Sequence, residues 1–221
     1  MLRTLCLLAA FFCLVFLCSC QKDNNNTPNT DSTAGEGYIP LTAGTYWVYK
    51  DSATDILDTA TVLSDKVMQN NISFTKVQLV SSSDTSYTYY AIQDHNYYLN
   101  DEIDSIRFTI RPLIDTANVG ASWVDNININ IGNTPVQAQG TGTIIEKLNT
   151  FTVQGQAFSD IIHTQYTMSV NVFGTNVNIA TYDFYFAKGK GIIKIKANIT
   201  ATIFGGGNTT STQDLVNYSI K

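Results

Sequence analysis

Apolar and polar residues alternate along much of this chain, and this period of two limits its possible folds more than any other feature. In residues 126–131, asparagine alternates with isoleucine at every position. In residues 193–203, every odd position is isoleucine or alanine and every even position is lysine, asparagine or threonine. Successive side chains of a strand point to opposite faces, so both segments predict strands with one dry and one wet face, as in antiparallel sheets.

Other segments follow the same pattern: residues 106–110, 166–172 and 182–186. Turn signals rich in Gly, Asn and Asp separate them. We therefore predict an all-β domain of roughly ten to twelve antiparallel strands, with little or no helix outside the N-terminal segment. Residues 56–67 also show a helical spacing of apolar residues, but the β-branched Thr59, Thr61 and Val62 favour a strand there.

Two short segments resemble each other: residues 44–49 (GTYWVY) and residues 120–125 (GASWVD). Each places a tryptophan three residues after a glycine. One interpretation is a duplication that produced two halves, and the other is that each tryptophan begins a strand and fills one end of a sheet. Six positions leave both open.

The first 19 residues predict a signal peptide. Arg3 supplies the positive start, and the apolar segment from Leu5 to Cys18 is too short to span a bilayer. Residues 21–37 contain no large apolar side chain, which predicts a flexible tether that spans about 20–25 Å. The predicted organisation is therefore a signal peptide at 1–19, a modified cysteine and tether at 20–37, and a single β domain at 38–221.

The segment Leu17-Cys18-Ser19-Cys20 resembles the lipobox of bacterial lipoproteins. The resemblance implies cleavage before Cys20, a diacylglycerol thioether on its sulfur and an acyl chain, commonly palmitate, on its new amine. Two or more chains anchor a protein stably. The residue after the cysteine, Gln21, is not the aspartate that retains such lipoproteins at the inner membrane, which implies the outer membrane and leaves its face open. A plain secretory signal is the alternative.

Cysteine and charge exclude several classes of function. All four cysteines lie within residues 6–20, so the mature chain has no disulfide, thiol catalysis or cysteine metal site. Removal of Arg3 leaves 12 Lys and Arg against 18 Asp and Glu, a net charge of −6. This balance argues against nucleic acid or an anionic membrane surface as a partner. The expected membrane contact is therefore the lipid, and no other cofactor is expected.

Short elements across the domain resemble a group of small bacterial outer-membrane lipoproteins of unassigned function. The most extended are Pro40-Leu41-x-x-Gly44-x-x-Trp47-x-Tyr49 and Phe186-Ala187-Lys188-Gly189-x-Gly191-Ile192-Ile193-Lys194. The resemblance implies an extended antiparallel sheet that curls into an open half-barrel or a sandwich-like form. It supplies no catalytic residues.

Few residues are candidates for catalysis or metal binding. Neither His95 nor His163 has a second ligand at metal spacing, and we interpret both as exposed polar residues, His95 in a hairpin turn. Asp101, Glu102 and Asp104 are a weak calcium candidate, because no glycine punctuates them as in a regular calcium loop. Glycines at 189 and 191 predict a tight turn or bulge between two strands.

Aromatic residues cluster on two strands that a short hairpin would join. The candidates for stacking on a sugar or lipid are Tyr87, Tyr89, Tyr97 and Tyr98, with Tyr90 beside them. Cross-strand stabilisation explains the same cluster.

These observations favour a lipid-anchored, non-enzymatic envelope protein that acts as a binding or assembly module, its protein or glycan partner unknown. The alternative is a carrier of a lipid or other apolar ligand inside a curled sheet. A carbohydrate-active enzyme with paired carboxylates is a third hypothesis, for which no motif singles out the pair.

A single substitution at Cys20 tests the predicted lipid anchor. Cys20→Ala removes the sulfur that would carry the diacylglycerol, so we expect the domain to leave the membrane fraction while remaining folded. Fractionation followed by circular dichroism measures both properties. A Cys20→Ala protein that still sediments with membranes would contradict a lipid-only anchor.

Overall fold

The computed structural model describes residues 37–221, apart from residues 83, 104–105, 132–133, 173 and 201–207. The predicted signal peptide, Cys20 and the tether up to residue 36 lie outside the described residues. The side chains of residues 101–107, 128–135 and 172 are not described either.

Twelve strands and no helix form the described part of the chain. The strands are β1 (Tyr46–Asp51), β2 (Leu57–Gln69), β3 (Ile72–Val80), β4 (Thr85–Gln93), β5 (Asn96–Ile103), β6 (Ile106–Ile114), β7 (Ser122–Ile131), β8 (Thr134–Val153), β9 (Gln156–Val172), β10 (Thr175–Ala187), β11 (Gly191–Thr200) and β12 (Asn208–Ser219). The all-β prediction is confirmed, and residues 57–69 form a strand as favoured. No helix able to cross a membrane is found among the described residues.

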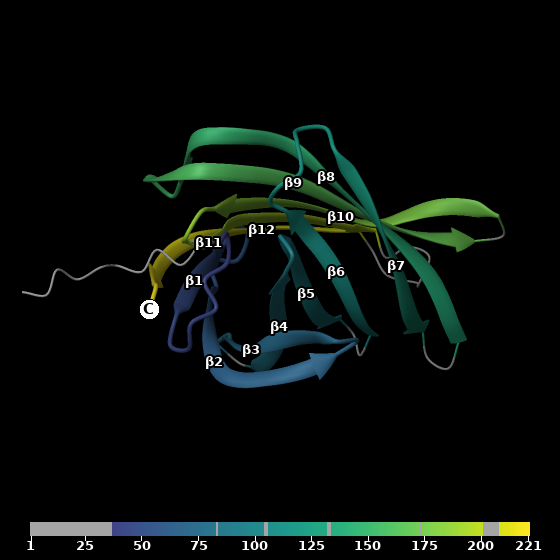
Figure 1. Ribbon diagram of the computed structural model, residues 1–221, viewed down its shortest axis with the longest axis horizontal. Helices are drawn as coiled ribbons and strands as arrows, with labels where there is room; N and C mark the ends of the chain where they lie inside the picture. Colours follow the sequence, from purple (N-terminus) through teal and green to yellow (C-terminus); the bar gives the residue numbers. More distant parts are fainter. Residues whose placement is uncertain (1–36, 83, 104–105, 132–133, 173, 201–207) are drawn as a thin grey trace, which may run out of the picture. The chain divides into compact units, whose positions relative to one another are not determined.

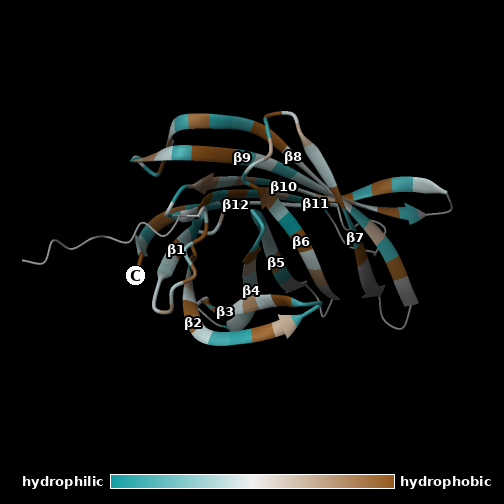
Figure 2. Ribbon diagram, in the orientation of Figure 1, coloured by the Kyte–Doolittle hydropathy of each residue, from teal (hydrophilic) through white to brown (hydrophobic). Residues whose placement is uncertain are grey.

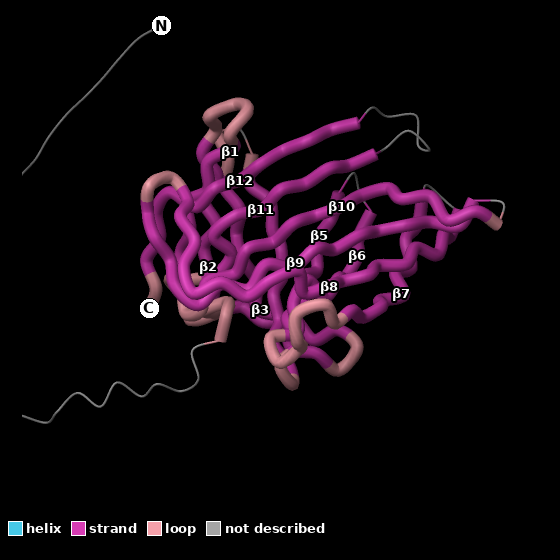
Figure 3. Tube along the Cα trace, turned by 90° about the horizontal axis from the view of Figure 1, so that it is seen from above, coloured by secondary structure: helices cyan, strands magenta, loops and turns pink. Residues whose placement is uncertain are grey.

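All twelve strands belong to one antiparallel sheet. Neighbours in sequence pair within β1–β6 and within β7–β12, and β1 pairs with β12 to join the two halves. The remaining edge strands, β6 and β7, lie close together, so the sheet curls into a nearly closed barrel (Figure 1). Strands β8 to β12 run side by side across the view of Figure 3. The pairing of β1 with β12 is what turns two open halves into a barrel.

Tight turns join many of the strands. Three hairpins have two-residue turns in which both residues have positive φ, at Asn70–Asn71, Asp94–His95 and Gln154–Gly155. This geometry matches the twist of paired strands, and Asn, Asp and Gly adopt it most readily. The predicted turn at His95 is therefore confirmed. Gly189 and Gly191 also have positive φ, and residues 188–190 form the predicted turn between β10 and β11. The ladder shifts register two residues later, where Ile193 lies between the pairs Tyr185–Lys194 and Phe186–Ile192.

The alternation predicted from sequence appears as alternating bands along the strands (Figure 2). On β7, Ile127 is buried while Asn126 is exposed. On β11, Ile193 and Ala197 are buried, whereas Lys196 is exposed. The buried faces form one continuous core with residues from every strand except β4, from Trp47 on β1 to Leu215 on β12, and the partly buried Tyr90 of β4 packs against it. This core fills much of the barrel.

Side chains close the seam between β6 and β7, where no backbone ladder is present. The backbone N–H of Arg111 donates to Asp125 Oδ2 at 3.1 Å, and Trp123 Nε1 donates to the carbonyl of Arg111 at 2.7 Å. The next carbonyl, that of Pro112, accepts from Thr164 Oγ1 at 2.8 Å. Because Pro112 has no N–H, this edge of β6 needs fewer acceptors than another strand would. These bonds satisfy the N–H and carbonyl of Arg111 and the carbonyl of Pro112 without a partner strand.

Two glycines on β8 let aromatic rings reach the seam. Tyr166, on β9, crosses β8 and donates its hydroxyl to Asp125 Oδ2 at 2.8 Å. A Cβ at Gly140 would lie within 2 Å of the Tyr166 hydroxyl, and a Cβ at Gly142 would meet the Trp123 ring at about the same short distance. Any side chain at these positions would displace the rings. Glycine is therefore required at both positions, because the rings of Tyr166 and Trp123 occupy the space that a side chain would need. The two rings cover this part of β8, which has no side chains of its own there.

The two tryptophan segments begin the two halves of the barrel with the same backbone bonds. Gly44 N–H donates to Val62 at 2.9 Å and Gly120 N–H to Ile144 at 2.8 Å, and each partner's own N–H donates back to the residue after the glycine. Both glycines have φ above 80°. Trp47 and Trp123 are each the second residue of the first strand of a six-strand half. The geometry thus extends the similarity of the two segments from sequence to structure.

The seam gives a stability prediction. Tyr166→Phe removes the hydroxyl that donates to Asp125 and leaves a largely buried carboxylate with one donor fewer. We expect the free energy of unfolding to fall by about 1–3 kcal/mol, measured by urea titration.

The matched control is Tyr87→Phe, whose ring is 42% exposed. We expect a change below about 0.5 kcal/mol there. Equal losses in the two variants would show that the hydroxyl at the seam contributes nothing specific.

Candidate functional site

A cavity of about 470 Å³ lies within the barrel, between β1–β5 and β11–β12. Its walls are mainly apolar, and the apolar residues come from six strands and the segment before β1. They are Ile39, Trp47, Tyr49, Ala60, Leu79, Val80, Tyr90, Leu99, Ile192 and Ile195. Binding sites for small molecules have this size and this predominantly apolar lining. The barrel core therefore leaves room for a ligand between these strands.

Polar residues complete the lining. They are Asp58, Ser81, Asp84, Ser86, Thr88 and Gln213. Of the described residues that line the cavity, two are aspartates and none is lysine or arginine. Asp58 accepts a hydrogen bond from Gln213 Nε2 at 3.4 Å, and this neutral donor leaves the charge of the carboxylate uncompensated. The polar part of the cavity thus favours a neutral or positively charged group.

The aromatic walls are held by the β10–β11 turn and β11. Trp47 Nε1 donates to the carbonyl of Lys190 at 2.6 Å, and the ring packs where a Cβ on Gly191 would clash. Tyr49 donates its hydroxyl to the carbonyl of Ile192 at 2.8 Å. Burial raises the pKa of Tyr49 well above its ordinary value, so this hydroxyl stays protonated and keeps its bond. The cavity walls are therefore formed before any ligand arrives.

The tyrosine candidates divide between the two faces of the sheet. Tyr90 lines the barrel cavity, whereas Tyr89 and Tyr98 line hollows that share no residue with it. Tyr87 is half exposed, with Lys76 Nζ 3.9 Å from its ring centre. Tyr97 is only 1% exposed, so it has no ring face open to a ligand. The period of two explains the division, because neighbouring tyrosines of a strand point to opposite faces.

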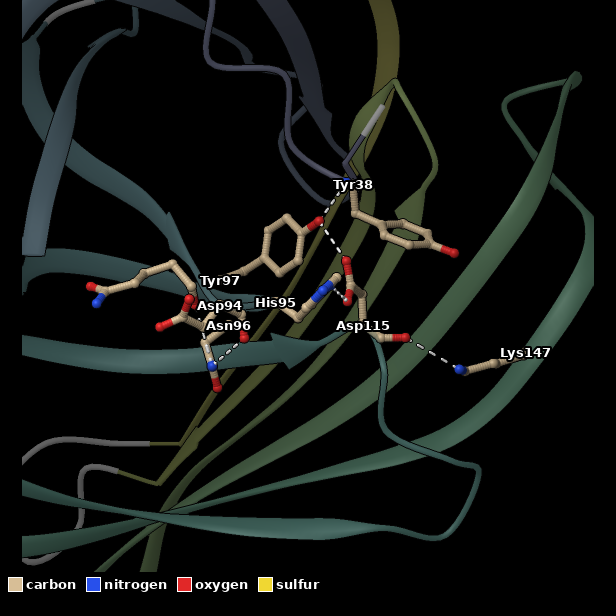
Figure 4. A network of polar contacts seen from close by, with 8 residues as sticks. Tyr38, Asp94, His95, Asn96, Tyr97, Asp115 and Lys147 are labelled. Carbon is tan, nitrogen blue, oxygen red and sulfur yellow. Dashed lines mark hydrogen bonds and ion pairs between the residues drawn. The ribbon is translucent and has the colours of Figure 1, made fainter. Parts of the chain in front are cut away.

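Tyr97 instead anchors the start of the domain (Figure 4). Its hydroxyl accepts from the backbone N–H of Tyr38 and donates to Asp115 Oδ2, both at 2.9 Å. Asp115 also contacts His95 Nδ1 at 2.9 Å, and its carbonyl accepts from Lys147 Nζ at 3.3 Å. Burial, followed by the Asp115 contact and charge, raises the pKa of Tyr97. These bonds fix Tyr38, at the start of the described domain, to β5 and to Asp115.

The interpretation of His163 as an exposed residue is wrong. It is 7% exposed and lies between two carboxylates, with Nδ1 3.1 Å from Glu146 and Nε2 3.0 Å from Asp183. Its ring stacks on Tyr185 at 4.1 Å between centres. Burial and then the charges of Asp183 and Glu146 raise the pKa of Tyr185. The three polar residues come from β8, β9 and β10, and sequence cannot identify them as neighbours without the strand register.

Metal and lipid candidates remain predictions. The side chains of Asp101, Glu102 and Asp104 lie outside the described residues. Among the residues that are described, no group of three or more His, Cys, Asp or Glu is arranged to hold a metal ion. Cys20, the predicted lipidation site, also lies outside them.

The fold is similar to those of solved structures. A candidate lipoprotein from Parabacteroides distasonis ATCC 8503 is 12% identical, with a TM-score of 0.53 over 83% of this chain and 99% of its own. A candidate exported protein with a YmcC-like fold from Bacteroides fragilis NCTC 9343 is 9% identical, with a TM-score of 0.50 over the same shares. At these identities the likeness concerns the fold alone. No family model and no curated protein matches the chain.

The anchoring role of Tyr97 is testable by proteolysis. Tyr97→Phe removes the acceptor for the Tyr38 N–H, so we expect residues 37–39 to detach more often and chymotrypsin to cleave after Tyr38 about fivefold faster. The measurement is the cleavage rate under native conditions, followed by mass spectrometry.

Tyr98→Phe is the matched control, since it makes the same change at the next residue on the opposite face of β5. Its cleavage rate should match that of the unmodified protein. If both variants are cleaved at the unmodified rate, the hydroxyl of Tyr97 does not hold this segment.

Proposed function

We propose that this chain is a non-enzymatic lipoprotein, anchored at the outer membrane through Cys20, that binds a small amphipathic ligand in the barrel cavity. The observation that carries the proposal is the cavity itself, with about 470 Å³ of space, apolar walls and two aspartates in its polar part.

The anchor is supported by sequence and by fold. The segment Leu17–Cys20 resembles a lipobox, and a polar tether of about 17 residues follows it. Both solved structures with this fold are named as candidates for export or lipidation. Gln21 in place of aspartate supports the outer membrane as the destination.

A binding function agrees with the chemistry of the cavity. Its described lining holds hydroxyls, one amide and two carboxylates, and no histidine, lysine or arginine. The apolar walls remove hydrocarbon from water, which provides most of the binding free energy. The polar groups then orient the ligand, as in other small-molecule sites.

The size and charge of the cavity define the ligand. A volume of about 470 Å³ suits one short hydrocarbon body and excludes a whole two-chain phospholipid. Asp58 and Asp84 favour a cationic or hydrogen-bond-donating head and disfavour an anionic one. We therefore expect a small cationic amphiphile to bind better than an anionic amphiphile of the same chain length.

Calorimetry with matched amphiphiles tests this proposal. Residues 21–221 are titrated with dodecyltrimethylammonium or with dodecanoate, each below its micelle concentration. We expect saturable binding of the cation, at least about tenfold tighter than of the anion, and a loss of about tenfold in the double variant Asp58→Asn, Asp84→Asn.

A cavity-filling variant identifies the site. Ala60 lines the cavity and is 5% exposed, so Ala60→Leu should abolish binding. Ala157→Leu adds the same methyl groups at an exposed position of β9 and should leave binding intact. Binding that survives Ala60→Leu, or that is absent from the unmodified protein, would overturn the proposed function.

A further inference from the structure

We infer that a second site, a groove between the tip of the β2–β3 hairpin and the β6–β7 seam, binds a neutral saccharide. The groove is independent of the barrel cavity, because the residues that line the two sites do not overlap.

Two adjoining hollows form the groove, with volumes of about 440 and 280 Å³. They share five wall residues and so are continuous: Gln69, Asn70, Phe74, Thr109 and Asn126. Their walls come from β2 and β3 on one side and from β4 to β7 on the other. The ladder between β2 and β3 shifts register between Val62 and Lys66, so the end of this hairpin is set at its own angle.

Aromatic rings provide one part of the groove chemistry. Phe74 is 2% exposed and packs edge-on against Tyr98, with ring centres 6.4 Å apart, although it does not belong to the main core. Tyr89 lines the larger hollow and Tyr98 the smaller one, and both are half-buried. A ring that is fixed on one side and open on the other is suited to stack against the C–H face of a sugar.

Amide side chains provide the other part. Four line the groove: Gln69, Asn70, Asn100 and Asn126. An amide carries both a donor and an acceptor group, which is what a row of sugar hydroxyls requires. This density of neutral hydrogen-bonding groups beside aromatic rings distinguishes the groove from the apolar barrel cavity.

Internal bonds hold part of this polar wall in place. Asn100 Nδ2 donates to Gln69 Oε1 at 3.0 Å and to Thr109 Oγ1 at 2.8 Å. In these bonds Gln69 and Thr109 are acceptors, so neither the amide N–H groups of Gln69 nor the hydroxyl hydrogen of Thr109 is used. A wall that is already ordered loses less entropy when a ligand binds.

Charge in the groove is internally balanced, which determines the kind of saccharide. The charged residues among its described walls are Arg111 and Asp125, and they pair with each other at 3.0 Å. Arg111 Nη1 also donates to Asn96 at 3.1 Å. An acidic sugar would lose hydration of its carboxylates without meeting a free cation, because the Arg111 guanidinium is already paired with Asp125, so the groove favours a neutral sugar.

The test uses the lipidated chain in phospholipid nanodiscs and saturation-transfer NMR. The probes are three neutral trisaccharides, maltotriose, cellotriose and mannotriose, and one acidic trisaccharide, trigalacturonate. We expect at least one neutral probe to bind, more tightly than trigalacturonate. Absence of binding by all three neutral probes, or tighter binding of the acidic one, would overturn the inference.

Variants locate the contact. Tyr89→Ala and Asn126→Ala should each weaken binding at least fivefold, through loss of a stacking ring and of an exposed amide. Asn149→Ala makes the same amide deletion at an exposed position of β8 outside the groove and should leave affinity unchanged. Binding that is unaffected by both groove variants, or equally weakened by Asn149→Ala, would place the sugar elsewhere and contradict the inference. Ala60→Leu, which fills the barrel cavity, should not change saccharide binding. The proposal for the groove can therefore be refuted independently of the proposal for the barrel cavity.

Discussion

The closure of the β6–β7 seam by side chains is the interaction on which the rest of this structure depends. Every strand of the twelve-stranded sheet pairs with two neighbours through backbone hydrogen bonds, except the two edge strands β6 and β7. At the seam between these two strands, Asp125 accepts hydrogen bonds from the Arg111 N–H and the Tyr166 hydroxyl. The closure is incomplete, since Arg111 Nε is a buried nitrogen without a partner in the described part of the chain. A seam held in this way closes the sheet into a barrel, and its residues Arg111 and Asp125 also line the groove.

Two hollows of different chemistry follow from this architecture. The barrel interior offers hydrocarbon walls with two aspartates, whereas the groove offers amides, aromatic rings and a compensated ion pair. The difference arises from the faces of the same strands: Tyr90 points to the interior and Tyr89 to the groove. One sheet can thus present two distinct ligand chemistries without a second domain.

Local patterns predicted the strands but not the contacts between them. The alternation around Ile127, the turn at Asp94–His95 and the glycines at 189 and 191 are encoded within a few residues, and each prediction is confirmed. The burial of His163 between Glu146 and Asp183 depends on the register of strands whose paired residues are 17 and 20 positions apart in the chain. The need for a glycine at position 140 beneath Tyr166 depends on strand register in the same way. A period of two would have separated Tyr97 from Tyr98, but only the pairing shows that Tyr97 binds Asp115.

A crystal structure of residues 21–221 with dodecyltrimethylammonium would show whether the barrel interior is a binding site. We expect one alkyl chain between Trp47 and Tyr90, with its head group beside Asp58 and Asp84. An interior filled by the protein's own side chains, or an amphiphile bound only on the outer surface, would contradict it.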